Sequence, residues 1–533
     1  MINFKTLFVY MLLSTFQHIK GISATKELEL WRSGVKSWDD LEALKNKQYH
    51  LFHDDENSIF YQSRKALKDG DTYFFAEKLA RPEHYRILLT FPEDTLFLDI
   101  ETTGLSIYYD TITLIGWMLN GDYGVYIKGD NIKSFNTALS KAKSLVTFNG
   151  SLFDIPFIRK EFPDLTLPEC HVDLRFLAKR VGLSGGQKSI EDKLGIERPK
   201  SLSNVAGEAA ALLWYQYRWG KVSALKKLIS YNYADVNNMR IILDKVIDRL
   251  VEKNKLPLSP KSMYRFAKKK SKISFSSTES RNNGIRIRPY KGHAGPSIRL
   301  RDLKILTHTF SGNQFKVVGI DLTGSEARPT GWCLLDNDYA ITKLLGSDNE
   351  IINETLNAKP NIVSIDSPLS LPSGRISVSD DDPGRNKYGI MRHCERVLKR
   401  RGINVYPSLI PSMQKLTARG IRLANHLRGL GIPVIESYPG AAQDIMGIPR
   451  KRASLSLLAK GLELFGIKGD FIKKHVSHDE LDAITSAVVG LFFWSGKYEA
   501  LGNEEEDYLI IPDLKTDPST IIKNETQPEL RAI

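Results

Sequence analysis

An apolar segment that ends in two acids, Thr95-Leu-Phe-Leu-Asp-Ile-Glu101, limits what this chain can fold into more than any other feature. Side chains alternate between the two faces of a β-strand, so Asp99 and Glu101 lie on one face, where their charges repel. A fold tolerates such a pair at the end of a central strand when a divalent cation neutralises both carboxylates. The alternative is a solvated strand end before a glycine turn at Gly104, which fits better if the pair stands alone.

The pair stands within a pattern of strands alternating with helices, which is typical of a layered α/β domain. Strands are expected at 95–100, 111–119 and 145–148, and helices at 154–161, 173–181 and 221–250. A second pattern of this kind begins at Phe315, with strands at 316–321, 362–366 and 433–437 and helices at 388–400, 412–430 and 479–494. The sequence therefore predicts two α/β domains.

Further carboxylates follow the Asp-x-Glu pair in the first pattern. Asp154 begins a helix after an apolar strand, and Tyr231 and Asp235 are four residues apart, hence on one face of a helix. Four acids and a tyrosine in this order resemble the DEDDy 3′–5′ exonucleases of the RNase H-like superfamily, and more closely their YprB-like branch. The resemblance also covers Leu13–Leu41 and continues to about Leu250.

This resemblance implies a role for each matching residue. The four acids, Asp99, Glu101, Asp154 and Asp235, would hold two Mg²⁺ or Mn²⁺ ions, and carboxylate oxygens are the ligands such ions prefer. Tyr231 would orient the attacking water, while Asn149 and Phe153 would line the scissile nucleotide. We expect His171, which lies nearby in the sequence, to be structural and not catalytic.

Acids end the strands of the second pattern too. Asp321, Asp366 and Glu436 each close a strand, and Asp479 and Asp482 lie one turn apart on the last helix. This region, from about Val317 to Pro512, resembles a family of RNase H-like nucleases known only as a domain of unknown function, and its last motif resembles Holliday-junction resolvases. The resemblance implies a catalytic role for all five acids and a metal-ligand role for all except Asp366. Asp479 has an alternative role as a favourable charge at a helix start.

The stretch between the two patterns, 256–312, is rich in Ser, Asn, Gly and Pro and is expected to be a linker. Lys261–Lys304 contains 13 Lys or Arg against two acids, so this segment carries most of the net charge of +13 of the chain. We expect its basic side chains to contact the phosphate backbone of a nucleic acid, foremost Lys268, Lys269, Lys270, Lys272, Arg286 and Arg288. A merely solvated linker is the alternative.

The rest of the sequence sets limits. Three widely spaced cysteines exclude a disulfide scaffold and suggest a reducing compartment, so we expect a cytoplasmic protein.

The apolar start, Met1–Leu13, imitates a signal peptide but is short and has no convincing cleavage site, so a core helix is expected. Residues 14–45 predict helix, turn and helix, with the turn at His18–Ser23; a helix-hairpin-helix contact to phosphate and a purely structural role both remain open. No apolar run is long enough to span a membrane.

The predicted organisation is a helical module at 1–88, an RNase H-like exonuclease domain at 89–255, a linker at 256–312, a second RNase H-like domain at 313–512 and a polar tail at 513–533. The predicted function is that of a metal-dependent 3′–5′ exonuclease on DNA or RNA. A structure-specific endonuclease in the C-terminal domain and a non-catalytic nucleic-acid-binding scaffold are the alternatives. The acids do not discriminate DNA from RNA, because they contact phosphate and metal and not the 2′-hydroxyl.

Overall fold

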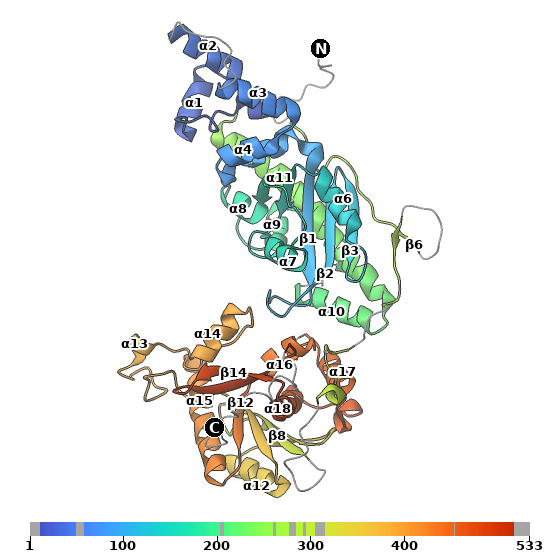
Figure 1. Ribbon diagram of the computed structural model, residues 1–533, viewed down its shortest axis with the longest axis vertical. Coiled ribbons are helices and arrows are strands. Elements are labelled where there is room, and N and C mark those ends of the chain that lie inside the picture. The colour runs from blue at the N-terminus through green and yellow to red at the C-terminus, as the bar shows by residue number, and fades with distance from the viewer. Residues whose placement is uncertain are drawn as a thin grey trace. The chain divides into compact units, whose positions relative to one another are not determined.

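The computed structural model describes residues 11–48, 58–202, 207–258, 263–276, 284–290, 295–303, 315–451 and 453–515. The chain divides into two compact units (Figure 1). The first contains Met1–Thr102 and Thr111–Tyr290, and the second contains Thr103–Asp110 and Lys291–Ile533. Each unit has a mixed β-sheet flanked by helices, which confirms the predicted α/β fold class with two domains.

The first unit begins with a helical region. It contains a 3₁₀ helix (Met11–Ser14), α1 (Ala24–Arg32), α2 (Trp38–Gln48), α3 (Ile59–Asp69), α4 (Thr72–Lys78) and α5 (Tyr85–Thr90). The first helix of the predicted helix–turn–helix is thus only this 3₁₀ turn. The indole N–H groups of Trp31 and Trp38 take the carbonyls of Ser14 and Thr15, which a continuing helix would use for its own hydrogen bonds.

The sheet of the first unit has the strand order β3-β2-β1-β4-β5. Its strands are β1 (Thr95–Thr102), β2 (Ile112–Leu119), β3 (Asp122–Ile127), β4 (Ser144–Thr147) and β5 (His171–Asp173). β1 pairs antiparallel with β2 and parallel with β4, so the strand that carries the two acids is central. The helices of this part are α6 (Lys133–Lys141), α7 (Asp154–Glu161), α8 (Leu174–Lys179), α9 (Gln187–Leu194), α10 (Gly207–Arg218) and α11 (Val222–Asn254).

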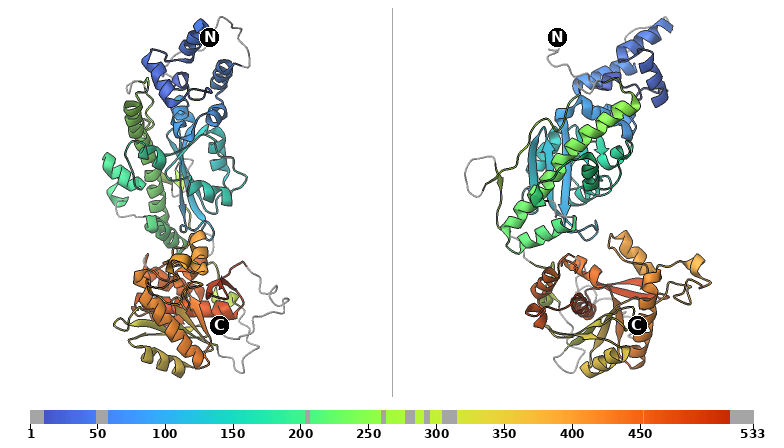
Figure 2. Two further views of the ribbon diagram at one scale, coloured as in Figure 1. Left: turned by 90° about the vertical axis from the view of Figure 1, so that its left-hand side faces the viewer. Right: turned by 180° about the vertical axis from the view of Figure 1, so that it is seen from behind.

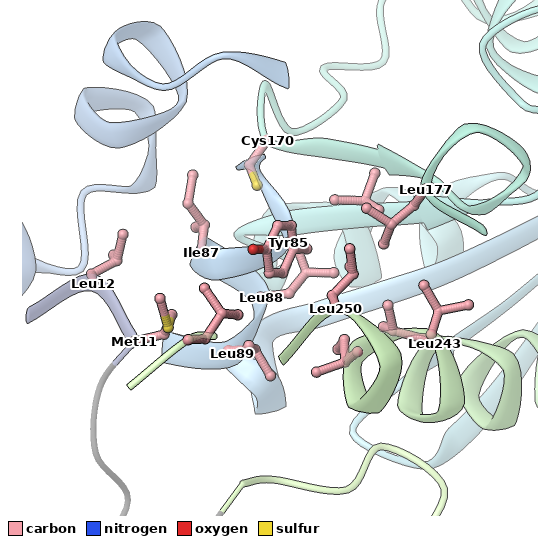
Figure 3. Packing of buried hydrophobic residues seen from close by; sticks show 14 of the residues in the cluster. Met11, Leu12, Tyr85, Ile87, Leu88, Leu89, Cys170, Leu177, Leu243 and Leu250 are labelled. Atoms are coloured by element: carbon pink, nitrogen blue, oxygen red, sulfur yellow. The ribbon is translucent and has the colours of Figure 1, made fainter. Parts of the chain in front are cut away.

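The long helix α11 crosses one face of this sheet, as the view from behind in Figure 2 shows. The helix comes very close to β2 at Gly116, where a Cβ atom would lie 1.6 Å from Oδ1 of Asn232. A larger residue at this position of the strand would therefore displace the side chain of Asn232. Leu243 and Leu250 of α11 also pack with Met11, Leu12 and the residues of α5, so the helical region and the sheet share one hydrophobic cluster (Figure 3).

The second unit repeats the order of the first sheet and extends it. Its strands are β8 (Lys316–Asp321), β9 (Thr330–Asp336), β10 (Tyr339–Leu345), β11 (Ile362–Asp366), β12 (Val434–Ser437), β13 (Lys468–Gly469), β14 (Tyr498–Asn503) and β15 (Asp507–Pro512). The order is β13-β10-β9-β8-β11-β12-β15-β14. As in the first unit, the central strand β8 pairs antiparallel with its sequence neighbour β9 and parallel with β11.

The helices of the second unit are α12 (Asp348–Ala358), α13 (Arg385–Tyr388), α14 (His393–Arg400), α15 (Pro411–Gly429), α16 (Pro439–Met446), α17 (Leu455–Phe465) and α18 (His478–Trp494). The closing helix α18 packs on β8 and β9, as α11 packs on β1 and β2. Glycines again permit the close approach: a Cβ atom at Gly319 would lie 2.0 Å from the carbonyl oxygen of Ala483, and one at Gly331 would lie 2.2 Å from that of Asp479. In both units, therefore, a helix that carries acids lies directly against the acid-bearing strand.

Parts of the stretch predicted to be a linker are packed into the two hydrophobic cores. Met263 and Phe266 are buried in the hydrophobic cluster of the first unit, and Ile298 and Leu303 are buried in that of the second. Two short strands, β6 (Phe275–Ser276) and β7 (Ile285–Arg286), pair with each other. The predicted domain bounds themselves stay a prediction. Across the described ranges, no helix is both long and apolar enough to cross a membrane.

Candidate functional site

The structure brings three of the predicted acids of the first unit together. Asp99 and Glu101 come from the end of β1, and Asp235 comes from α11. One carboxylate oxygen of each can be chosen so that all three lie within 4.8 Å of one another. Since α11 reaches the sheet at Gly116, which pairs with Asp99 in the β1–β2 register, the helix places Asp235 beside the strand.

Asp154, the fourth predicted acid, lies at the first position of α7 and is almost fully buried. Its Oδ1 accepts a hydrogen bond of 3.1 Å from the backbone N–H of Ile100, between the two acids of β1. Burial raises the pKa of this carboxyl to about 7, and the charges of Asp173 and Asp235 add to the rise. The four predicted acids therefore share one electrostatic environment.

The other three carboxyls are also hard to ionise when no metal is bound. Burial and the charge of Asp235 raise the pKa of Asp99 and of Glu101 well above the usual range. Burial likewise raises the pKa of Asp235 to about 6, although Arg198 acts in the opposite direction. Such shifts are typical of buried carboxylates whose charges are not fully compensated by nearby cations.

A divalent cation fits this donor set. All the donors are carboxylate oxygens, the ligands that Mg²⁺ and Mn²⁺ prefer. Among the described residues, Oε1 of Glu101 is buried and has no hydrogen-bond partner. A buried oxygen of this kind is costly unless something binds it, and a cation would satisfy it.

Asp99 is held by a residue that the sequence analysis did not single out. The side-chain amide of Asn232, on α11, donates to Oδ2 of Asp99 at 2.8 Å and to its backbone carbonyl at 3.2 Å. The hydroxyl of Tyr123 donates to Oδ1 of Asn232 at 2.8 Å and so fixes the orientation of the amide. In the sequence, only the position of Asn232 next to Tyr231 could have indicated that it belongs to the site.

Tyr231 lies one turn before Asp235 on α11, and two cations lie over its ring. Nζ of Lys188 is 5.1 Å from the ring centroid, and the guanidinium carbon of Arg198 is 5.6 Å from it. Arg198 also forms ion pairs with Asp235 and with Glu191, which is buried on α9. No motif pointed to these three residues, because they come from α9 and the loop after it.

Asn149 and Phe153 lie in the loop between β4 and α7. Asn149 has a positive φ of 65°, and its backbone N–H donates to Oδ1 of Asp173 at 2.8 Å. Its side-chain oxygen accepts from Nη1 of Arg175 at 2.6 Å. The ring of Phe153 is partly buried, which leaves only part of it available for stacking on a base.

His171 has a structural contact. Its Nε2 lies 2.9 Å from Oγ1 of Thr147 on the neighbouring strand. Burial lowers the pKa of its imidazole to about 4, so the ring is neutral near pH 7.

The second unit has an acid cluster at the equivalent place. Asp321 and Asp366 end the adjacent parallel strands β8 and β11 and stand opposite each other in the register. Burial and the charge of Asp482, on α18, raise the pKa of Asp366 to about 8. In the part of the chain that the structure describes, Oδ2 of Asp321 is buried and has no hydrogen-bond partner. Nζ of Lys451 lies 2.7 Å from Oδ2 of Asp482 and 3.7 Å from Oδ2 of Asp321.

Asp479 borders the same cluster from the start of α18. Together with Asp321, Thr323, Arg328 and Ser412 it lines a cavity of about 380 Å³. Nδ1 of His478 lies 2.7 Å from Oδ1 of Asp479. Two acids of the second unit, Asp321 and Asp479, therefore border a cavity that is also lined by the basic side chain of Arg328.

Glu436 does not join this cluster, and we correct its assignment as a metal ligand. In the β11–β12 register it pairs with Ile365 and not with Asp366, so it lies on the opposite face of the sheet from the acids. Its Oε2 accepts from Nη1 of Arg392 at 2.7 Å and from the backbone of Leu369 at 2.8 Å, and its Oε1 accepts from Nη2 of Arg392. Both oxygens are thus already used in a buried ion pair.

The four lysines of the predicted phosphate-binding cluster, Lys268, Lys269, Lys270 and Lys272, are exposed. Their backbone is fixed to α11: Nη2 of Arg240 donates to the carbonyl of Lys269, and the hydroxyl of Tyr233 to that of Ser271, both at 2.7 Å. Arg288 is exposed as well, whereas the side chain of Arg286 lies outside the described residues.

Comparison with known protein families relates the sheet of the first unit to the RNase H superfamily. The family model of the RNase H superfamily matches residues 96–247. No curated protein matches the chain.

Among the solved structures that are similar to parts of the chain, three have a TM-score of 0.24 each. One, described as the apo form of a nuclease, is 19% identical and covers 30% of this chain and 75% of its own. The EXO domain of Nibbler from Aedes aegypti is 13% identical and covers 36% and 88%. A family B DNA polymerase from the archaeon Pyrobaculum calidifontis is 13% identical and covers 79% and 53%. TM-scores this low do not establish a shared fold.

Proposed function

We propose that the first unit is a divalent-metal-dependent 3′–5′ exonuclease that hydrolyses the terminal phosphodiester bonds of DNA or RNA. The observation that carries this proposal is the convergence of Asp99, Glu101 and Asp235, with Asp154 beside them and a buried oxygen of Glu101 left without a partner. The match of residues 96–247 to the RNase H superfamily supports it.

The acids would hold two Mg²⁺ or Mn²⁺ ions, which supply Lewis-acid chemistry for an in-line displacement at phosphorus. Asn232 keeps Asp99 in place, and Arg198 keeps Asp235 in place, so both carboxylates are oriented before a cation arrives. Burial raises the pKa of Tyr231, and the nearby acids raise it further, so its hydroxyl stays neutral. A neutral hydroxyl orients the attacking water through hydrogen bonds and does not act as a base.

A tyrosine-type site fits better than a histidine-type site. Tyr231 lies on the same helix face as Asp235. His171, in contrast, is hydrogen-bonded to Thr147, and its imidazole stays neutral at physiological pH. We therefore assign the orientation of water to Tyr231.

The second unit supports a second, separate candidate function, a metal-dependent nuclease of the endonuclease type. The observation that favours it is the cluster of Asp321, Asp366, Asp479 and Asp482 at the end of the central strand. A non-catalytic scaffold would not need two sets of buried acids, because buried unneutralised carboxylates destabilise a fold.

Degradation of labelled substrates tests these proposals. Purified protein with Mg²⁺ or Mn²⁺ should shorten 3′-labelled linear DNA or RNA from its 3′ end and release labelled mononucleotides at once. The same strand labelled at its 5′ end should give a ladder of shortening products, and EDTA should stop both reactions. Cleavage of circular substrate would assign an endonuclease to the second unit, and binding without any degradation would contradict both enzymatic proposals.

The exposed lysine cluster predicts how binding depends on salt. Replacing Lys268, Lys269, Lys270 and Lys272 with Gln should flatten the slope of log affinity against log salt concentration by up to about three to four units for duplex substrate. The reason is that each lysine that contacts a phosphate releases condensed counterions. Fluorescence anisotropy across a salt series measures the slope, and turnover at saturating substrate should stay near that of the wild type.

A matched control removes the same charge elsewhere. Lys460, Lys468, Lys473 and Lys474 are exposed residues of the second unit, and their replacement with Gln should leave the slope nearly unchanged. Equal slopes for the wild type and the cluster variant would show that the cluster is merely solvated.

A further inference from the structure

Lys451 occupies the place of a cation within the acid cluster of the second unit. Its ammonium nitrogen lies 2.7 Å from Oδ2 of Asp482 and 3.7 Å from Oδ2 of Asp321. Both acids are almost fully buried, whereas the lysine side chain is 35% exposed. A lysine side chain next to two carboxylates carries its positive charge at physiological pH. The cluster is thus partly neutralised by the protein itself.

The equivalent cation of the first unit is held differently. Arg198 contacts Asp235 and is anchored by Glu191, an acid that does not belong to the metal-binding set. Lys451, in contrast, forms no ion pair outside the cluster among the residues that the structure describes. A partly exposed lysine has a long, flexible stem, and Lys451 can leave the two carboxylates without breaking an ion pair to a group outside the cluster.

An ammonium group between two carboxylates competes with a divalent cation for the same oxygens. Once it leaves, its charge can pair with an anion that lies outside the cluster. The phosphodiester groups of a nucleic acid are such anions, and lysine binds phosphate well as a point charge.

We propose that Lys451 exchanges the carboxylates of Asp321 and Asp482 for a phosphate of bound nucleic acid, and thereby admits a divalent cation to the second unit when substrate is present. This inference rests on the proposed metal-dependent function of that unit. Under this proposal, binding of nucleic acid frees the carboxylates for the metal, and binding of metal frees the ammonium group of Lys451 for a phosphate. The two binding events therefore strengthen each other.

Metal affinity measured without catalysis tests the exchange. The full chain carries Asp99→Asn and Glu101→Gln to silence the first site, and Mn²⁺ binding is followed by electron paramagnetic resonance. A single-stranded oligonucleotide is absent or present, and Mn²⁺ bound by the oligonucleotide alone is subtracted. In this parent protein the oligonucleotide should raise the Mn²⁺ affinity by about tenfold.

In the Lys451→Met variant, Mn²⁺ should bind about tenfold more tightly without the oligonucleotide, and the oligonucleotide should add little. Lys451→Arg keeps the charge and should retain the weak binding of the parent. Lys460→Met is the matched control, since Lys460 is an exposed lysine paired only with Glu463 among the described contacts, and it should change nothing.

Two results would overturn the inference. If Lys451→Met, or Lys451→Gln should the first variant not fold, binds Mn²⁺ no more tightly than the parent, the lysine does not compete with metal. If no variant binds Mn²⁺ at the second unit, the metal-dependent function proposed for that unit fails together with the inference.

Discussion

Replacing Asp99 with Asn should reduce the exonuclease rate by about 10⁴-fold, the size of loss seen when a central catalytic group is removed. Asp99 offers one of the three convergent carboxylate oxygens, and an amide is a much poorer ligand for Mg²⁺ or Mn²⁺. The fold should survive, because the side-chain oxygen of Asn can still accept the hydrogen bond that Asn232 donates to Asp99. The rate of release of labelled 3′-terminal nucleotide measures the loss.

The same variant should be more stable than the wild type when metal is removed, and increasingly so as pH rises. Burial raises the pKa of Asp99 in the folded protein, whereas an unfolded chain has the ordinary value. Between these two values the folded state holds a proton that the unfolded state has released, so the stability of the wild type falls with rising pH. Asn does not titrate and escapes this loss. Thermal unfolding in EDTA at pH 5 and pH 8 measures the difference.

Asp122 provides a matched control for both effects. It is an exposed aspartate on β3, so Asp122→Asn should change neither the rate nor the pH dependence of stability. Undiminished 3′-end trimming by the Asp99→Asn protein would contradict the site assignment. A lower melting temperature of that protein in EDTA at pH 8 would contradict the electrostatic explanation.

The Tyr231→Phe variant should lose about 10²-fold in turnover while its affinity for substrate and metal stays close to that of the wild type. The change removes only the hydroxyl group and keeps the ring over which Lys188 and Arg198 lie. A group that orients water contributes to the rate and not to ground-state binding. Single-turnover rates and anisotropy-based affinities separate the two quantities.

Tyr233 is the matched control for this prediction. It lies two residues away on α11, and its hydroxyl donates to the carbonyl of Ser271 at 2.7 Å. Tyr233→Phe should therefore leave turnover nearly unchanged. A large loss of substrate affinity at unchanged turnover in Tyr231→Phe would show that Tyr231 is a packing or contact residue.

Local patterns in the sequence located much of the fold. β8, β11 and α7 have the bounds that hydrophobic runs and their polar ends predicted. The period of a strand placed Asp99 and Glu101 on one face, and the period of a helix placed Tyr231 with Asp235. Shorter or more polar elements, such as β5 with its three residues and α9, were missed because they carry too few apolar positions to form a pattern.

The partners of the acids were decided by the tertiary structure alone. Arg198 and Lys451 come from loops without periodicity, and no spacing in the sequence relates them to Asp235 or Asp482. Glu436 is an acid whose place in the fold the sequence pattern predicted wrongly. Asp366 is the last residue of β11, whereas Glu436 lies one residue before the end of β12, and this difference of one residue turns Glu436 to the opposite face, toward Arg392.

The sequence by itself determined which residues are acidic, on which kind of element they lie, and which near neighbours share a face. It did so because the periods of strands and helices are properties of the local backbone. Only the tertiary structure decided which acids meet, which cation lies among them and how closely the closing helices approach at Gly116, Gly319 and Gly331. Strand register and the packing of distant segments are set by contacts between parts of the chain that no local pattern connects.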